Sequence, residues 1–138
     1  MSRVINSDTP GQNRNRLLKL LSVTIAELNQ SKFPADELND AVAFIVLSLI
    51  EIEKTITQTT APWEKREYWV KADQFRSEWK WVGEIKAKLI QSRTEKGWSK
   101  IPLETGILEA ELKTIEPLNR MKGKTFWKGA YSIFIGKQ

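Results

Sequence analysis

Few residues of this chain have side chains that could carry out chemistry on a substrate. The sequence contains no histidine and no cysteine, which removes imidazole bases, thiolate nucleophiles, disulfides and most zinc, haem or iron–sulfur sites. Oxygen ligands for Mg²⁺ remain, and the candidate group lies within residues 36–53, on one predicted helix. These acids are Asp36, Glu37, Asp40, Glu51 and Glu53.

We interpret these acids as a helix N-terminus, where negative charge is favoured, and a solvated stripe on the same helix. No second segment supplies paired carboxylates to complete a metal site. We therefore predict a protein that is not an enzyme, with no catalytic residue, no metal site and no cofactor. An enzyme that uses only carboxylates and lysines is the alternative.

Two segments place a glycine between two lysines, a composition that phosphate-binding loops also have. They are residues 96–100 (KGWSK) and residues 122–125 (KGKT). Neither matches the GxxxxGK[ST] pattern after a strand, which a nucleotide site of this kind requires. We interpret both as loops whose ammonium and main-chain N–H groups could touch a nucleic-acid backbone.

The net charge of +5 lies at the C-terminal end of the chain. Residues 117–138 hold five basic and no acidic side chains, whereas residues 1–116 hold 17 of each. Cations without counter-charges favour phosphate binding, because each neutralised phosphate releases counterions. We predict that Arg120, Lys122, Lys124 and Lys128 bind phosphates and that Trp127 stacks on a base or contacts a partner. The alternative is an ordinary basic surface beside a small aromatic core.

A second basic and aromatic group occurs near the middle of the chain. If residues 60–93 form one helix, Lys65, Trp69, Arg76 and Lys80 project within about 40° of one direction at roughly 100° per residue. A tryptophan among cations can stack on a base or anchor a protein partner. The alternative is that Trp69 lies against a neighbouring helix while the lysine stems cover apolar surface.

The elements that must position these residues are predicted to be helices. Apolar residues recur at steps of three and four, and Pro34, Pro62 and Pro102 stand where helices begin. The predicted helices run from Asn13 or Asn15 to residue 30 and then over residues 34–57, 60–93, 102–117 and 126–135. We predict an all-α fold, a single bundle of four or five helices over residues 14–138, after a flexible arm at residues 1–13.

The apolar pattern also predicts the packing of these helices. Apolar residues surround most of the 34–57 helix, which is typical of the central helix of a bundle. In the 60–93 helix, a stripe at three-, four- and seven-residue steps is predicted to face the core: Tyr68, Ala72, Phe75, Trp79, Val82 and Leu89. For residues 126–135 we expect a helix with Phe126, Ala130, Tyr131 and Phe134 inward, and a strand at 131–135 is the alternative.

No segment has the character of a membrane span. The first residues lack the apolar stretch of a secretory signal. The longest apolar run, residues 41–50, is about half of the roughly 20 residues that a span needs. We therefore expect a cytoplasmic protein without a membrane partner.

The tail NRMKGKTFWKGAYSIFIGKQ, at the end of a short, basic and helical chain, resembles the small helical subunit of CRISPR effector complexes. The resemblance covers size, helical content, charge and the character of this tail. It implies a bundle that contacts the repeating backbone subunits and holds nucleic acid through surface lysine and arginine. It also implies a product that corresponds to the C-terminal part of a larger subunit, in some systems made by internal translation.

These observations predict a non-catalytic subunit of a ribonucleoprotein assembly. It would bind the backbone of DNA or RNA without reading sequence, and its other partners would be protein subunits. The alternative is a protein–protein adaptor whose exposed tryptophans are the main contacts and which has no role with nucleic acid. Binding that weakens steeply with salt would distinguish the first function from the second.

Overall fold

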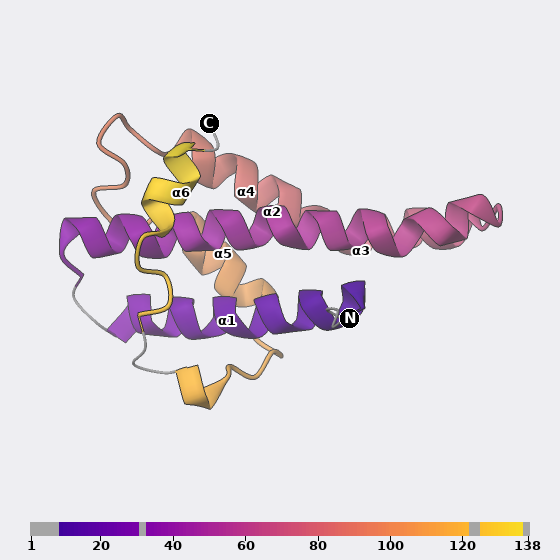
Figure 1. Ribbon diagram of the computed structural model, residues 1–138, viewed down its shortest axis with the longest axis horizontal. Helices are drawn as coiled ribbons and strands as arrows, with labels where there is room; N and C mark the ends of the chain where they lie inside the picture. Colours follow the sequence, from indigo (N-terminus) through magenta and orange to yellow (C-terminus); the bar gives the residue numbers. More distant parts are fainter. Residues whose placement is uncertain (1–8, 31–32, 122–124, 137–138) are drawn as a thin grey trace, which may run out of the picture.

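A computed structural model of the chain describes residues 9–30, 33–121 and 125–136. Within these ranges the regular elements are all helices, so the predicted all-α class is confirmed (Figure 1). In chain order they are α1 (Pro10–Gln30), α2 (Ala35–Lys65), α3 (Trp69–Glu78), α4 (Lys80–Gln91), α5 (Glu104–Glu111) and α6 (Ala130–Gly136), with a 3₁₀ turn, η1 (Asn119–Met121), before α6.

Helix α2 is the central element, as its all-round apolar pattern predicted. It packs against α1, α3, α4 and α6. Its aliphatic side chains form the middle of one hydrophobic core, to which the other helices add residues such as Leu21, Val82, Leu108 and Phe134. Helices α1 and α2 run antiparallel, and α6 crosses the first half of α2 (Figure 1).

Helix α1 begins at Pro10, so the predicted start at Asn13 or Asn15 is wrong. The reason is a capping box. The Gln12 N–H donates to Thr9 Oγ1 at 3.1 Å, and the Thr9 N–H donates to Gln12 Oε1 at 2.8 Å. Pro10 follows the cap, where its missing N–H is not needed. Residues 10–13 of the predicted arm therefore belong to α1, and residues 1–8 lie outside the described residues.

Helix α2 continues to Lys65, so the predicted break between residues 57 and 60 is wrong. The threonines of this segment bond back to their own helix instead. The Thr55 hydroxyl donates to the Ile52 carbonyl at 2.6 Å, and the Thr60 hydroxyl donates to the Ile56 carbonyl at 3.1 Å. Because these hydroxyls are satisfied inside the helix, they do not compete with it.

The predicted helix over residues 60–93 is instead the end of α2 followed by α3 and α4. A Schellman motif ends α2: the Glu67 N–H donates to the Glu64 carbonyl at 3.0 Å, and the Tyr68 N–H donates to the Trp63 carbonyl at 2.8 Å. Glu67 adopts the left-handed conformation (φ 64°) that glycine usually supplies there. The chain reverses at this point, and α3 returns along α2. Tyr68, which we predicted in the core, is 51% exposed.

The reversal produces a helical hairpin that extends beyond the first turn of α1 (Figure 1). Helix α2 has 31 residues and α1 has 21, which corresponds to lengths of about 46 and 32 Å at 1.5 Å per residue. Since the two helices are joined by a short connection at one end, the other end of α2 overhangs. The last turns of α2 and the first turn of α3 therefore hold the 66–68 turn at a distance from the hydrophobic core (Figure 1).

Arg14 connects α1 to this hairpin. Its buried guanidinium donates to Thr55 Oγ1 at 3.1 Å and to Thr59 Oγ1 at 3.2 Å. It also lies over the Phe75 and Trp79 rings, 5.0 and 5.2 Å from their centroids. Burial lowers the pKa of the Arg14 guanidinium below its ordinary value. One side chain thus joins α1, α2 and the segment from α3 to Trp79.

Candidate nucleic-acid interface

The C-terminal aromatic segment belongs to the core. Trp127, which we predicted to stack on a base or contact a partner, is only 3% exposed. Its ring packs edge-to-face on Phe126 and Phe33, with centroids 4.9 and 5.9 Å away. The assignment of Trp127 to a binding surface is therefore corrected. Trp127 is buried because α6, which follows it in the chain, packs its apolar face, including Ala130 and Phe134, against α2.

The cations predicted beside Trp127 have different positions. Arg120 is exposed in η1, and Lys128 is exposed in the turn that precedes α6. Lys122 and Lys124 lie outside the described residues. The phosphate-binding role of all four cations remains a prediction. The Trp127 ring is buried, so it is not available beside them to stack on a base.

The acidic candidate Asp40 holds α6 in place. Its carboxylate accepts the Gly129 N–H at 3.0 Å and the Tyr131 N–H at 2.9 Å, so a side chain of α2 caps the start of α6. Replacing Asp40 with alanine removes two charge-assisted bonds and is expected to lower the free energy of unfolding by about 1.5–3 kcal/mol. Urea denaturation of the parent and the variant would measure this loss of stability. The conservative Asp40→Asn keeps one acceptor and should lose less; equal losses would contradict the capping role.

The remaining acidic candidates are in ion pairs or at the surface. Glu51 pairs with Lys54 at 2.9 Å, and Glu53 pairs with Lys86 of α4 at 2.5 Å. Asp36 and Glu37 stand in the first turn of α2, as predicted. Among the described residues, no group of three or more acids is arranged to hold a metal ion.

The glycine-containing loop at residues 96–100 is tied to α2. The Trp98 N–H donates to Asn39 Oδ1 at 2.6 Å, and the Asn39 amide donates to the Lys96 carbonyl at 3.3 Å. Gly97 has φ 91°, and a Cβ there would collide with the Asn39 amide. A side chain of the protein thus occupies the space beside this glycine. The glycine serves the turn and its close approach to α2.

The second predicted group does not form one helix face. Lys65 ends α2, Trp69 and Arg76 lie on α3, and Lys80 begins α4. Arg76 pairs with Glu64 at 2.9 Å and with Asp73 at 2.6 Å. Lys80 faces Glu84 at 3.9 Å. The prediction of a common face is wrong because it assumed a continuous helix through the 66–68 turn.

The acids around Arg76 stabilise the protonated form of its guanidinium. The hydrogen bond from Asp73 raises the pKa of the Arg76 guanidinium, and the bond and charge of Glu64 act in the same direction. Arg76 is therefore a compensated cation that joins α3 to the end of α2. Its charge is therefore less available to an external anion than the charge of an unpaired side chain.

The turn between α2 and α3 carries the most distinctive surface of the described residues. We call it the hairpin tip and define it by six residues: Lys65, Arg66, Tyr68, Trp69, Val70 and Lys71. All six are exposed, and Trp69 and Val70 are 54% and 71% exposed. Lys71 lies over the Trp63 ring, 4.3 Å from its centroid. None of the three cations forms an ion pair with another described residue.

Sequence reasoning singled out Lys65 and Trp69 but missed Arg66, Tyr68 and Lys71. Tyr68 was assigned to the core stripe of a continuous helix over residues 60–93, and on that helix Arg66 and Lys71 would project away from the face of Lys65 and Trp69. A Schellman turn with glutamate at the left-handed position has no simple sequence signal. The exposed pair Tyr68–Trp69 is visible only once the chain is known to reverse there.

No helix in the described ranges is long and apolar enough to cross a membrane. Comparisons of the chain with protein-family models, with curated proteins and with solved structures find no match.

Proposed function

We propose that this chain is a non-catalytic, nucleic-acid-binding helical subunit of a larger cytoplasmic ribonucleoprotein assembly, and that the hairpin tip contacts single-stranded nucleic acid. The observation that supports this proposal is the position of Tyr68 and Trp69, two exposed aromatic side chains between exposed cations. Sequence-independent binding of single strands combines these two features: rings stack on bases, and cations follow the phosphates.

The exposed cations of the hairpin tip lie before and after the two aromatic residues in the sequence. Lys65 and Arg66 precede the two aromatic residues, and Lys71 follows them. The nearby acids Glu64 and Asp73 are engaged by Arg76, which leaves Glu67 as the acid within the turn. The local charge is therefore positive, although the chain segment as a whole is nearly balanced.

The first test replaces Lys65, Arg66 and Lys71 together with glutamine. Three phosphate contacts on a single strand correspond to a log–log salt slope of roughly −2, or about 20-fold weaker binding between about 50 and 200 mM salt. The triple variant should lose most of that slope on unrelated DNA and RNA sequences. Fluorescence anisotropy with labelled oligonucleotides at several salt concentrations measures it.

A matched control replaces Arg16, Lys19 and Lys88 with glutamine. These exposed residues of α1 and α4 change the net charge by the same amount at other surfaces. If control and tip variants lose the same affinity, only the overall charge matters and the tip is not the site. If the parent does not bind single strands in dilute salt, the proposed function is wrong.

Trp69→Ala tests the stacking contact separately. Stacking on one base contributes about 1–3 kcal/mol, so single-strand affinity should fall about 5- to 150-fold while the salt slope stays the same. The fold should tolerate this change because the ring is more than half exposed. Unchanged affinity with an unchanged melting curve would remove Trp69 from the site.

An adaptor function is the second candidate, and one observation favours it. Val70 and Leu103 are 71% and 88% exposed, and aliphatic side chains neither stack on bases nor bind phosphates. Binding to a protein partner that is insensitive to salt would support this function. From the sequence resemblance alone, we also propose that the assembly is a CRISPR effector complex.

A further inference from the structure

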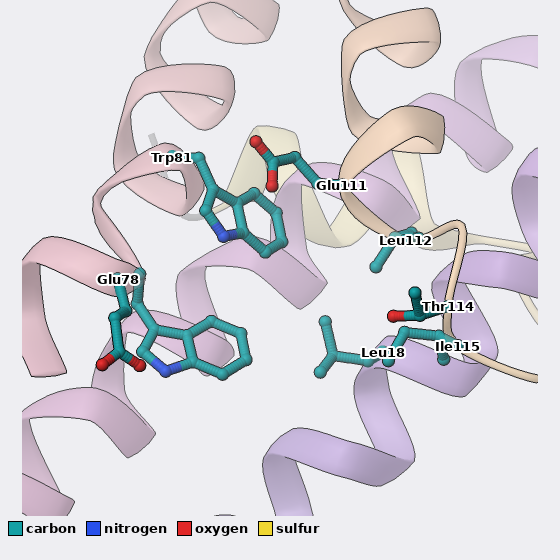
Figure 2. A pocket seen from close by; sticks show the side chains of 8 residues that line it. Leu18, Glu78, Trp81, Glu111, Leu112, Thr114 and Ile115 are labelled. Atoms are coloured by element: carbon teal, nitrogen blue, oxygen red, sulfur yellow. The ribbon is translucent and has the colours of Figure 1, made fainter.

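A cavity of about 220 Å³ lies where α1, the junction of α3 and α4, and the end of α5 meet (Figure 2). Its walls are of three kinds. Leu18 and Leu112 supply aliphatic surface, Trp79 and Trp81 supply indole rings, and Glu78 and Glu111 supply carboxylates. These residues come from segments far apart in the sequence, so only the fold brings them together.

The two indoles form adjoining walls of this cavity. Their centroids are 5.9 Å apart, and their planes are inclined by 34°. In Figure 2 the Glu111 carboxylate lies beside the Trp81 ring, and Leu18 and Leu112 face that ring across the open space. Both tryptophans are only partly exposed, so their rings are held by packing and present fixed surfaces.

The carboxylates at the cavity have no cation of their own. Glu78 and Glu111 are exposed, and neither forms an ion pair with another described residue. The Arg14 guanidinium lies 5.2 Å from the centroid of the Trp79 ring but is not part of the cavity wall. That contact shows that a ring of this cluster already accepts a guanidinium.

We propose that this cavity binds an organic cation, an ammonium or guanidinium group carried on a short aliphatic chain. Tryptophan is the ring that attracts cations best, within about 6 Å of its centroid. The Glu111 carboxylate adds charge complementarity beside the Trp81 ring, and the leucines fit an aliphatic stem (Figure 2). A metal ion does not match this wall, because among the described residues no group of three or more acids lies together to hold one, and most of the lining is indole and aliphatic. This inference is independent of the proposed function at the hairpin tip.

An ammonium or guanidinium group on an aliphatic chain could come from two sources. One is a lysine or arginine side chain of a partner protein, and the other is a free small cation. We therefore test it on the full chain with N-butylguanidinium and with the capped peptide acetyl-Gly-Arg-Gly-amide. N-butylurea, which has nearly the same shape and no charge, is the matched neutral probe. Heteronuclear NMR of the Trp79 and Trp81 indole N–H groups reports occupancy, after assignment by substitution of each tryptophan.

Saturable shifts of both indole signals with N-butylguanidinium are expected, with binding at least about tenfold tighter than that of N-butylurea. Peptide binding that is as tight or tighter identifies a partner's side chain as the natural occupant. Binding of the small cation alone identifies a free ligand. Equal binding of the neutral and charged probes, or no shift with either cation, overturns the proposal.

Variants separate the two parts of the site. Trp81→Leu should weaken binding about 5- to 30-fold through loss of the cation–π contact. Glu111→Gln should weaken it about two- to fivefold, as for an exposed charge pair, and should not affect the fold because the side chain is exposed.

Glu95→Gln, at an exposed position of the 94–97 turn, is the control with the same charge change. If it weakens binding as much as Glu111→Gln does, the effect is only overall charge and the assignment of Glu111 is overturned. A Glu111→Gln variant with unchanged affinity does the same.

Discussion

Replacing Trp98 with alanine is expected to lower the free energy of unfolding by about 3–5 kcal/mol. Trp98 is 3% exposed and packs against Tyr131 and Phe134 of α6, with centroids 6.0 and 5.9 Å away. Its indole N–H donates to the Leu89 carbonyl and to Ser92 Oγ, both at 3.1 Å. The substitution therefore leaves a cavity and removes hydrogen bonds at the place where α4, α6 and the 94–98 turn meet.

Chemical denaturation followed by circular dichroism measures this loss. Trp69→Ala is the control, since it removes the same side chain from the hairpin tip, where about half of it is exposed. We expect the control to cost less than about 1 kcal/mol. Similar losses in the two variants would contradict the packing of Trp98 between α4 and α6.

Replacing Trp127 with alanine is the second change with a large expected effect, again about 3–5 kcal/mol. The ring is buried among Phe33, Phe126 and the start of α6, so its removal leaves a cavity between α2 and α6. Denaturant melts measure the loss. Under conditions where the variant is folded, its affinity for single-stranded nucleic acid should equal that of the parent.

A comparison of phenylalanine variants sharpens this prediction. The Trp127 indole N–H is buried and has no hydrogen-bond partner among the described residues. Trp127→Phe keeps most of the packing and removes an unsatisfied donor, so it should cost less than Trp98→Phe, which loses two made bonds. A Trp127→Ala protein that is as stable as the parent and binds single strands more weakly would restore the stacking role that burial argues against.

Much of the fold was predictable because apolar periodicity is a local property of the sequence. The all-α class, the central position of α2 and the inward side of α6 followed from which residues recur at helical spacing. The start of α2 followed from Pro34 and the acids after it. The start of α1 also has a sequence signal, the capping box of Thr9 and Gln12, which apolar periodicity alone does not detect.

The end of α2 was not predictable from the same signals. Threonine and proline near a helix end usually indicate a break, but here the threonine hydroxyls bond within the helix and Pro62 is tolerated four residues before the turn. The reversal occurs at Glu67, a residue with no strong preference for a turn. Favourable packing of α3 along α2 outweighs the roughly 1–2 kcal/mol that a left-handed residue costs.

The sequence by itself determined the chemistry that is present: no histidine or cysteine, a helical core pattern and an excess of positive charge near the C-terminus. Tertiary structure decided which side chains are available for binding. It buried Trp127 and exposed Trp69, although both are tryptophans among cations. It also gathered Trp81 and Glu111 at one cavity across 30 positions of the chain. The physical reason is that exposure and proximity depend on long-range packing of helices, which local periodicity does not specify.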